Sequence, residues 1–411
     1  MDEARAAIAA LLRPITDIQT VALADALGRV LAADLVSPID VPAHDNSAMD
    51  GYALHGSDLL ADAPTTLCAL PGTVFAGAPF EDSVATGHCL RIMTGAVMPA
   101  ELDTVVPIEL CSVDGDTVTL RPGVLRVGEN RRRRGEDLAL GKPALLAGQR
   151  LRPADLGLIA SLGFAQVTVM RRLRVALFST GDELRNPGEP LPPGCIYDSN
   201  RASLRAALTC LGVEVLDLGL VPDAPAALRA TLDAAVAGAD AVVTSGGVSM
   251  GDADHTREML ASMGTVAFWK VAMRPGRPFA FGPLRSTGGA DGRTPFLFAL
   301  PGNPVAALVT FYAFVRDAVL MLSGAQAQPL PVLQARSVAA IRKRPGRTEY
   351  QRAIVDPSPS GWQVRLTGSQ GAGILRSMSE ANALAVLRHE QGSVAAGEMV
   401  DVWLFDGLLS H

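Results

Sequence analysis

The sequence has few cysteines, and none of them stands in a metal-binding pattern. The five cysteines are scattered along 411 residues without a Cys-x-x-Cys pair. Zinc sites built on cysteine need such closely spaced pairs, and the disulfide frameworks of small secreted domains need a higher density of cysteines. The sequence therefore argues against both classes. We expect reduced thiols that pack as small apolar side chains, in a cytoplasmic protein.

Excess positive charge is also missing. Only three of the 36 basic residues are lysines, and the formal net charge is −6. A chain without an overall basic field is not built to attract nucleic acid or an anionic membrane, so we expect neither as a partner. The N-terminal stretch MDEARAAIAALLRP begins with acidic residues and lacks the basic region of a signal peptide.

The sequence lacks a long uninterrupted apolar run as well. The longest run, residues 303–322, contains the adjacent charges Arg316 and Asp317. A membrane-spanning helix needs about 20 consecutive and predominantly apolar residues. The interruption therefore predicts a buried core helix in a folded domain, and no membrane span.

What is present indicates several domains, since this length accommodates about two to four. Residues 3–34 favour helix, with a break at Pro14, and residues 151–164 favour a second helix. Between them, residues 55–130 alternate short apolar runs with glycine, proline and aspartate turns. That pattern is typical of a small β-rich domain.

A different rhythm begins after Arg172, where apolar strands alternate with helical stretches. The predicted strands are 173–180, 213–221, 240–247, 265–273 and 295–302, and the predicted helices are 199–212, 225–238 and 253–264. This alternation is the signature of an open, largely parallel α/β sheet. After a linker at 324–332, alternating strands at 348–355, 362–368, 383–389 and 398–405 predict a C-terminal β-barrel-like module.

Three stretches rich in glycine or proline follow predicted strands of the α/β region. They are STGDEL at 179–184, TSGGVSMGDAD at 244–254 and LPGNP at 300–304. Ligands of open α/β sheets bind beyond the carboxyl ends of the strands. Each stretch alone is compatible with an ordinary tight turn, and LPGNP alone is a helix start. Three of them at one sheet edge predict a binding site.

The second stretch combines glycines with aspartates. Glycines at a turn that leads into a helix expose N–H groups, which attract anions. Asp252 and Asp254 would repel a phosphate unless a hard cation such as Mg²⁺ bridged the two, with Glu183 and Asp182 as further oxygen ligands. Alternatively, both aspartates only cap the helix. The residues expected to bind substrate here are Ser245, Gly246, Gly247 and Ser249.

These glycines do not follow a nucleotide-binding motif. The stretch SGGVSMG matches neither G-x-G-x-x-G nor G-x-x-x-x-G-K-[ST]. A dinucleotide-binding or P-loop site is therefore not expected.

Arginines are clustered at two places. In RPGRPFAFG, Arg274 and Arg277 flank a Pro-Gly turn, and two guanidinium groups on one turn suit a tetrahedral oxyanion. The alternative is a solvated basic turn. The same choice arises for RRRRGED at 131–137, where a solvated face accounts for at least half of the arginines.

The order of these motifs resembles one known family. The stretches DNSAMDGYA, RIMTGAVMP, DTVVPIE, RRGED, STGDEL, YDSN, TSGGVSMGDAD, RPGRPFAFG and LPGNPVA occur in the order found in the MoeA-type molybdopterin molybdenumtransferases, which include the E domain of gephyrin. The resemblance covers roughly residues 10 to 405. It implies insertion of molybdate into adenylylated molybdopterin with release of AMP and a requirement for Mg²⁺ or a similar ion.

The resemblance also implies a multidomain architecture of α/β and β parts. We expect a small helical domain from residues 1–45 and 141–171, an inserted β-rich domain at 46–140, a central MogA-like open α/β sheet domain at 172–325, and a C-terminal β-barrel at 326–411. Members of the family work as homodimers, with the active cleft shared between subunits. A molybdopterin adenylyltransferase is a possible further partner.

Carried over position by position, the family's functional residues fall on defined positions of this chain. Those expected to act in catalysis are Asp50, Thr94, Asp137, Glu183, Asp223 and Asp254, with Glu183 and Asp254 as the Mg²⁺ ligands. Those expected to bind substrate are Lys270, Arg274, Arg277, Pro278, Pro301, Pro304 and one of Arg347 and Arg352, with Ser377 as a further candidate.

The chain departs from its relatives in three of these motifs. Arg274 and Arg277 stand where many relatives have lysine, Ala306 replaces a frequent serine, and Glu101-Leu102 replace a glycine-containing turn. None of these changes removes a predicted Mg²⁺ ligand. Two other functions stay open from the residues alone, namely adenylylation of molybdopterin and a non-enzymatic scaffold. The choice between molybdate and tungstate also stays open.

Overall fold

A computed structural model describes residues 1–246, 263–285, 294–326 and 330–406. By its internal contacts the chain divides into two compact units, and each is described below by itself. One consists of Met1–Ala33, Ala147–Leu156 and Ala165–His411, and the other of Asp34–Leu146 and Gly157–Phe164. The expected division into four domains stays a prediction.

The N-terminal region is helical only at its start. Helix α1 (Asp2–Leu11) is followed by strand β1 (Ile18–Ala22), the 3-10 turn η1 (Leu23–Asp25) and strand β2 (Leu35–Val36). The prediction of helix up to residue 34 is therefore wrong. The β-branched residues of β1 pair antiparallel with β12 (Gln166–Met170), and this pairing outweighs the helix propensity of the neighbouring alanines and leucines. Helix α2 (Pro153–Ser161) is present as predicted.

The second unit contains the predicted β-rich insertion. Its six-stranded sheet has the order β7 (Thr104–Pro107), β4 (Gly51–Leu54), β6 (His88–Ile92), β5 (Thr65–Val74), β9 (Thr117–Leu120) and β8 (Cys111–Asp114). Two short ladders accompany it: β3 (Asn46–Ser47) pairs with β10 (Arg131–Arg132), and β2 pairs with β11 (Pro143–Leu145). Side chains such as Ala53, Leu90 and Val105 form its buried core.

The central sheet of the other unit is mostly parallel, as predicted. Strands β16 (Glu214–Val221), β13 (Arg174–Thr180), β17 (Ala241–Ser245) and β21 (Phe296–Leu300) are parallel neighbours in that order. Strands β20 (Pro278–Pro283) and β18 (Ala267–Lys270) extend the sheet antiparallel. Strands β17 and β21 are buried throughout, as expected of central strands with both faces covered.

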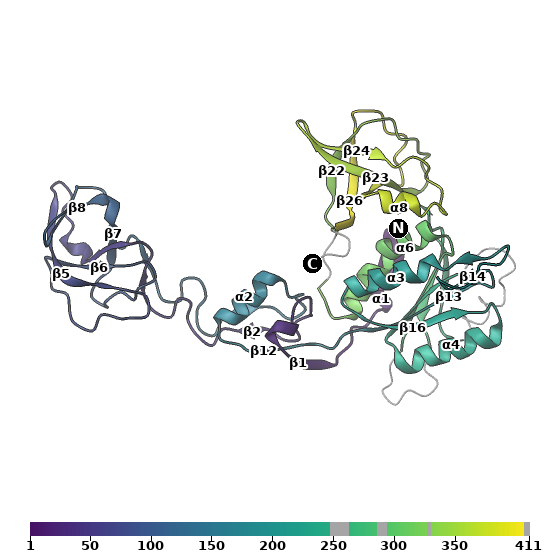
Figure 1. Ribbon diagram of the computed structural model, residues 1–411, viewed down its shortest axis with the longest axis horizontal. Coiled ribbons are helices and arrows are strands. Elements are labelled where there is room, and N and C mark those ends of the chain that lie inside the picture. Colours follow the sequence, from purple (N-terminus) through teal and green to yellow (C-terminus); the bar gives the residue numbers. More distant parts are fainter. Residues whose placement is uncertain (247–262, 286–293, 327–329, 407–411) are drawn as a thin grey trace. The chain divides into compact units, whose positions relative to one another are not determined.

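Helices cover both faces of this sheet, so alternate residues of one strand belong to different cores (Figure 1). Val175 and Leu177 of β13 pack in the core that contains α3 (Ser199–Cys210) and α1. Ala176 and Phe178 pack in the core that contains α4 (Pro225–Gly238). The sheet is thereby fixed from both sides, which gives its strand ends defined positions.

The long apolar run forms a buried helix. Helix α6 (Pro304–Thr310), the π-helical turn η4 (Phe311–Val315) and helix α7 (Arg316–Leu322) follow one another without a break. The most apolar 18-residue stretch of Pro304–Leu322 has a mean hydropathy of 1.8, and 83% of it is buried inside the protein. This agrees with the prediction of a core helix.

The C-terminal strands close into the predicted barrel. They are β22 (Leu333–Ser337), β23 (Thr348–Ser358), β24 (Gly361–Leu366), β25 (Ala383–Leu387) and β26 (Met399–Leu404), with the short helix α8 (Arg376–Glu380) between two of them. The order β23-β24-β22-β26-β25 is closed by pairing of β25 with β23. The short strand β19 (Met273–Arg274) joins β23 in parallel and so connects the arginine turn to the barrel.

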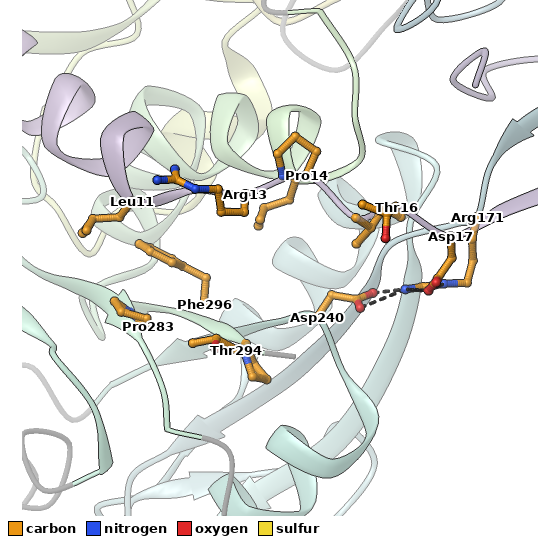
Figure 2. Close-up of a pocket in the computed structure, with 13 residues that line it drawn as sticks. Leu11, Arg13, Pro14, Thr16, Asp17, Arg171, Asp240, Pro283, Thr294 and Phe296 are labelled. Carbon is orange, nitrogen blue, oxygen red and sulfur yellow. Dashed lines mark hydrogen bonds and ion pairs between the residues drawn. The ribbon is translucent and has the colours of Figure 1, made fainter. Parts of the chain in front are cut away.

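An ion-pair network lies at the amino ends of the parallel strands. Arg171 makes two hydrogen bonds of 2.9 and 3.0 Å to the Asp240 carboxylate and one of 2.9 Å to Asp17, beside a pocket of about 610 Å³ (Figure 2). The bonds to Asp240 raise the pKa of Arg171 further above its ordinary value. The network fastens the segment after α1 to this edge of the sheet. The charges of Arg171, Asp17 and Asp240 are therefore engaged with one another.

The arginine turn depends on a glycine. Gly276 has a φ of +98°, and a Cβ atom there would lie 2.3 Å from the Thr310 hydroxyl oxygen of α6. We expect Gly276→Ala to lower the free energy of unfolding by more than Gly346→Ala, a matched control with a φ of +95° and open space around it. In both variants the left-handed conformation lowers the free energy of unfolding by about 1–2 kcal/mol. The clash with Thr310 lowers it by about 1–3 kcal/mol more in Gly276→Ala alone.

Thermal or denaturant unfolding measures this difference. The double variant Gly276→Ala/Thr310→Ala should recover most of the excess loss, because the Thr310 hydroxyl has no hydrogen-bond partner among the described residues. Equal losses for the two glycine variants would contradict the close approach of the turn to α6.

Candidate functional site

The predicted strand-end loops meet in one pocket. The carboxyl ends of β13, β17 and β21 lie side by side, because these strands are parallel neighbours. The pocket beyond them has a volume of about 640 Å³ and is lined from the three loops by Thr180, Gly181, Glu183, Ser245, Gly246, Gly302, Asn303 and Pro304. The expectation that the three motifs share one sheet edge is confirmed.

Glu183 presents an exposed carboxylate to this pocket. Its backbone is fixed by short strand pairing of β14 (Leu184–Arg185) with β15 (Ile196–Tyr197), in which the Ile196 N–H donates to the Glu183 carbonyl at 2.9 Å. The carboxylate lies against Gly181, where a Cβ atom would be 2.6 Å from Oε2. Within the described part of the chain no hydrogen bond or ion pair engages this carboxylate, so it remains available to a ligand.

Asp223 lines the same pocket from the loop after β16. Its carboxylate accepts a short hydrogen bond from the Thr180 hydroxyl, and its N–H donates to the Asp182 carboxylate at 3.1 Å. Asp182 therefore has a structural role in holding this loop. Of the predicted acids, the structure brings Glu183 and Asp223 together, while Asp254 lies outside the described residues, as do Gly247, Ser249 and Asp252.

The donor set was compared with the needs of Mg²⁺. Among the described residues, no group of three His, Cys, Asp or Glu side chains is arranged to hold a metal ion. Mg²⁺ is commonly bound by one or two carboxylates, several waters and the phosphates of the substrate, so a complete cage of side chains is not required. The unengaged carboxylate of Glu183 at the pocket fits the role of one such ligand.

The start of the glycine-rich stretch is tightly packed. Gly246 has a φ of +95°, and a Cβ atom there would lie 2.3 Å from the Thr180 carbonyl oxygen, so only glycine fits. Its N–H donates to the Leu300 carbonyl at 3.1 Å and is therefore not free for an anion, in contrast to the expectation. Pro301 and Pro304 surround the beginning of α6, where Asn303 occupies the N-cap position without a capping hydrogen bond from its side chain.

The arginine turn lies where β19 meets the barrel. Arg274 is in β19 and Arg277 precedes Pro278, the first residue of β20, and both arginines are exposed. Lys270, at the end of β18, lines a different pocket of about 930 Å³ beside α1 and the barrel, together with Tyr350 and Trp403. None of the predicted oxyanion-binding residues lines the pocket that contains Glu183; this holds for Lys270, Arg274, Arg277, Pro278, Arg347 and Arg352.

The two alternatives in the barrel differ in their surroundings. Arg347 forms an ion pair of 2.8 Å with Glu349. Arg352 is 1% exposed and donates to the Ser377 hydroxyl and the Gly371 carbonyl, both at 2.9 Å. Burial, with the nearby charge of Arg274, lowers the pKa of Arg352 to about 10. Because these partners are neutral oxygens, Arg352 is a better candidate than Arg347 to attract an anion.

The remaining predicted residues belong to the second unit. The Thr94 hydroxyl and N–H both donate to one Asp50 carboxylate oxygen at 2.7 Å, and these bonds lower the pKa of Asp50. Asp137 is exposed. In the RRRRGED stretch, Arg131 pairs with Asp45 and Arg134 with Asp40, at 2.7 and 2.6 Å. These two arginines are therefore structural.

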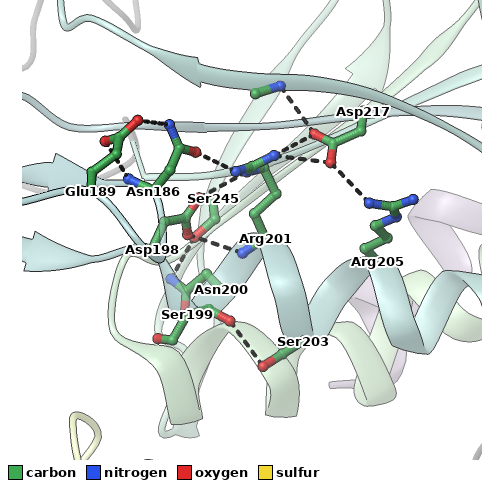
Figure 3. Close-up of polar contacts among 11 residues, drawn as sticks. Asn186, Glu189, Asp198, Ser199, Asn200, Arg201, Ser203, Arg205, Asp217 and Ser245 are labelled. Atoms are coloured by element: carbon green, nitrogen blue, oxygen red, sulfur yellow. Dashed lines mark hydrogen bonds and ion pairs between the residues drawn. The ribbon is translucent and has the colours of Figure 1, made fainter.

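A network of polar contacts around the start of α3 was not predicted from the sequence (Figure 3). Asp198 caps α3 by accepting from the Arg201 N–H at 3.0 Å, and Asn200 lines the pocket. The YDSN stretch was recognised as a family motif without a role for its residues. The available signal was an aspartate directly before the predicted helix 199–212, because aspartate is a preferred N-cap residue.

Comparison with known proteins covers nearly the whole chain. Residues 1–163 match the MoeA N-terminal region (domain I and II), residues 176–321 a probable molybdopterin binding domain, and residues 334–405 the MoeA C-terminal region (domain IV). The chain is similar to the molybdopterin molybdenumtransferase of Haemophilus influenzae, with 40% identity over 100% of this chain and 99% of the relative.

Two further relatives agree. A molybdopterin molybdenumtransferase 2 of Mycobacterium tuberculosis is 36% identical over 98% of both chains. The crystal structure of a molybdopterin biosynthesis MoeA protein from Pyrococcus horikoshii is similar to this fold, with a TM-score of 0.82, 27% identity, and coverage of 98% of this chain and 99% of that one. The chain therefore belongs to the MoeA family of molybdopterin molybdenumtransferases.

Proposed function

We propose that this chain inserts molybdenum from molybdate into adenylylated molybdopterin and releases AMP, giving the molybdenum cofactor. The observation that carries the proposal is the pocket at the carboxyl ends of β13, β17 and β21, with the unengaged Glu183 carboxylate at its wall. The chain is similar over its full length to relatives named molybdopterin molybdenumtransferase, and this similarity supports the class of reaction.

The pterin substrate carries a phosphoanhydride, and the pocket offers groups suited to it. Attack by an oxygen of molybdate or water on the AMP phosphorus breaks the P–O bond to the pterin phosphate, and AMP leaves with the attacking oxygen. Molybdenum is taken up as two Mo–S bonds to the dithiolene form and two Mo–O bonds break, with the displaced oxygen leaving in AMP or as water with the thiol protons. Ser245, Asn303 and the backbone of Gly302 supply polar groups around the pocket. The contribution of the protein is positioning and the handling of negative charge, as in other phosphoryl transfer.

Mg²⁺ is proposed to assist this step, with Glu183 and Asp254 as its protein ligands. When bound, the ion neutralises charge on the phosphate oxygens. Glu183 is suited to this role because its carboxylate faces the pocket while its backbone is held by β15. Asp223 lies on the same wall, where its bond from Thr180 orients the carboxylate.

Molybdate is proposed to bind near Arg274, Arg277 and Arg352, with Lys270 as a further cation. The guanidinium of Arg352 is buried among neutral oxygens and close enough to Arg274 for their charges to interact. Two like charges held near each other favour an anion between them, because the anion relieves their repulsion. We further propose that the protein acts in the cytoplasm as a homodimer, supplied by a molybdopterin adenylyltransferase.

Glu183→Gln is the direct test of the acid at the pocket. The amide keeps the shape of the side chain but removes its negative charge, so we expect AMP release to fall below detection while adenylylated molybdopterin still binds. AMP release is followed with adenylylated molybdopterin, molybdate and Mg²⁺, and binding is measured by calorimetry. Normal turnover in this variant would remove Glu183 from the mechanism.

Glu214→Gln is the matched control. Glu214 undergoes the same chemical change at the first residue of β16, where it forms a half-exposed ion pair with Arg174 at the opposite edge of the sheet. This variant should retain AMP release. Consumption of ATP by the unmodified protein, without release of AMP from the adenylylated substrate, would instead favour the adenylyltransferase reaction.

Arg274→Gln tests the proposed molybdate site. Loss of a hydrogen bond to a charged group costs about 1.5–3 kcal/mol, so the molybdate concentration for half-maximal rate should rise about tenfold to 150-fold. The control is Arg365→Gln, which removes an exposed arginine paired with Asp356 in the barrel. Identical molybdate dependence in Arg274→Gln and the control would exclude Arg274 from the site.

A further inference from the structure

One amide side chain joins two of the loops that form the pocket. Asn200, the second residue of α3, donates from Nδ2 to the Ser245 hydroxyl at 2.6 Å and to the Gly302 carbonyl at 2.7 Å. Ser245 is the last residue of β17, and Gly302 follows β21. A single NH₂ group therefore spans two neighbouring strand ends.

The chemistry of these contacts requires an amide donor. A carbonyl oxygen only accepts, so the group facing Gly302 must be a donor, which fixes the orientation of the Asn200 amide. Aspartate has the same shape but, when ionised, no donor at all. Both hydrogens of Nδ2 are used in the bridge, and Oδ1 has no hydrogen-bond partner among the described residues.

The base of this bridge is itself held firmly. Asp198 caps α3, and the neighbouring Arg201 donates from Nη1 to both Asp217 carboxylate oxygens at 2.8 and 2.9 Å and from Nη2 to the Asn186 side chain at 2.6 Å (Figure 3). The Asp198 N–H donates to the Arg185 carbonyl at 2.9 Å, directly after the segment that carries Glu183. The first turn of α3 thus contacts all three strand-end loops.

We infer that Asn200 is a positioning residue that holds the carboxyl ends of β17 and β21 at the spacing required for turnover. It acts through Ser245 and Gly302, and the inferred effect on turnover rests on the proposed function. The Gly246 N–H donates to the Leu300 carbonyl between the same two strand ends, so this bond reports on their spacing. Its exchange with solvent provides a measurement that does not depend on activity.

The test compares Asn200→Ala with Asn382→Ala. Asn382 is a matched control because its side chain also bridges backbone groups, accepting from the Val355 N–H at 2.8 Å and donating to the Val355 carbonyl at 2.9 Å, but in the barrel. In Asn200→Ala we expect exchange in peptides covering 241–246 to rise about tenfold and kcat for AMP release to fall about tenfold. Asn382→Ala should lower Tm without either change.

Two further variants keep the inference falsifiable. Ser245→Ala removes one acceptor and should raise the same exchange, including in the case that Asn200→Ala fails to fold. The double variant Asn200→Ala/Ser245→Ala should have a kcat within about threefold of that of Asn200→Ala, because both changes break the same bridge. Unchanged exchange in the folded variants would overturn the inference, and so would an equal loss of kcat in Asn200→Ala and in Asn382→Ala at the same loss of Tm.

The activity measurement tests the proposed function, and the exchange measurement tests the bridge independently of it. Absence of AMP release from the unmodified protein would contradict the proposed function. Increased exchange at 241–246 in Asn200→Ala would still support the bridge in that case, and unchanged exchange would refute it whatever the activity.

Discussion

The candidate site depends on the parallel pairing of β13, β17 and β21. Parallel strands with both faces buried have their carboxyl ends at one edge, and the loops that leave them must then approach each other. The core that holds this arrangement is continuous, since α1, α3 and α6 contribute to the same cluster as Val175 and Leu177. Glu183 and Ser245 are neighbours for this reason, although about 60 residues separate them in the chain.

Several arginines of this protein form ion pairs that hold its segments together. Arg171 fastens the N-terminal segment to Asp240 at one edge of the sheet, while Arg201 organises the start of α3 at the other. Arg131 and Arg134 are paired with aspartates inside the second unit. These pairs distinguish structural arginines from Arg274 and Arg352, which lie near one another and form no ion pair with a carboxylate among the described residues. The two groups of arginines differ in whether a carboxylate lies beside the guanidinium, and the sequence alone does not show this.

Much of the α/β fold was predictable because its strands and helices are local patterns of strong periodicity. Strands β13, β16, β17, β18 and β21, helices α3 and α4, and the barrel strands β23 to β26 lie where the apolar pattern predicts them, whereas strands β20 and β22 were not predicted. Residues 15–34 were predicted wrongly because β1 is stabilised by a partner about 150 residues away, which no local window contains. The position of the pocket was predictable from strand order, whereas the bonds of Asn200 and the pairing of the Gly246 N–H depend on tertiary geometry.

The parallel ladder between β19 and β23 has a consequence for how the protein can be divided. Met273 and Arg274 take their register from Thr348 and Glu349 of the barrel, and the Thr348 N–H donates to the Ala272 carbonyl at 2.9 Å. The arginine turn is therefore built jointly by two segments that look separable in the sequence. A fragment ending before the barrel would lose the strand that aligns Arg274, together with Tyr350, Leu384 and Trp403 of the shared core, so this module cannot be separated from the barrel without changing the arginine turn.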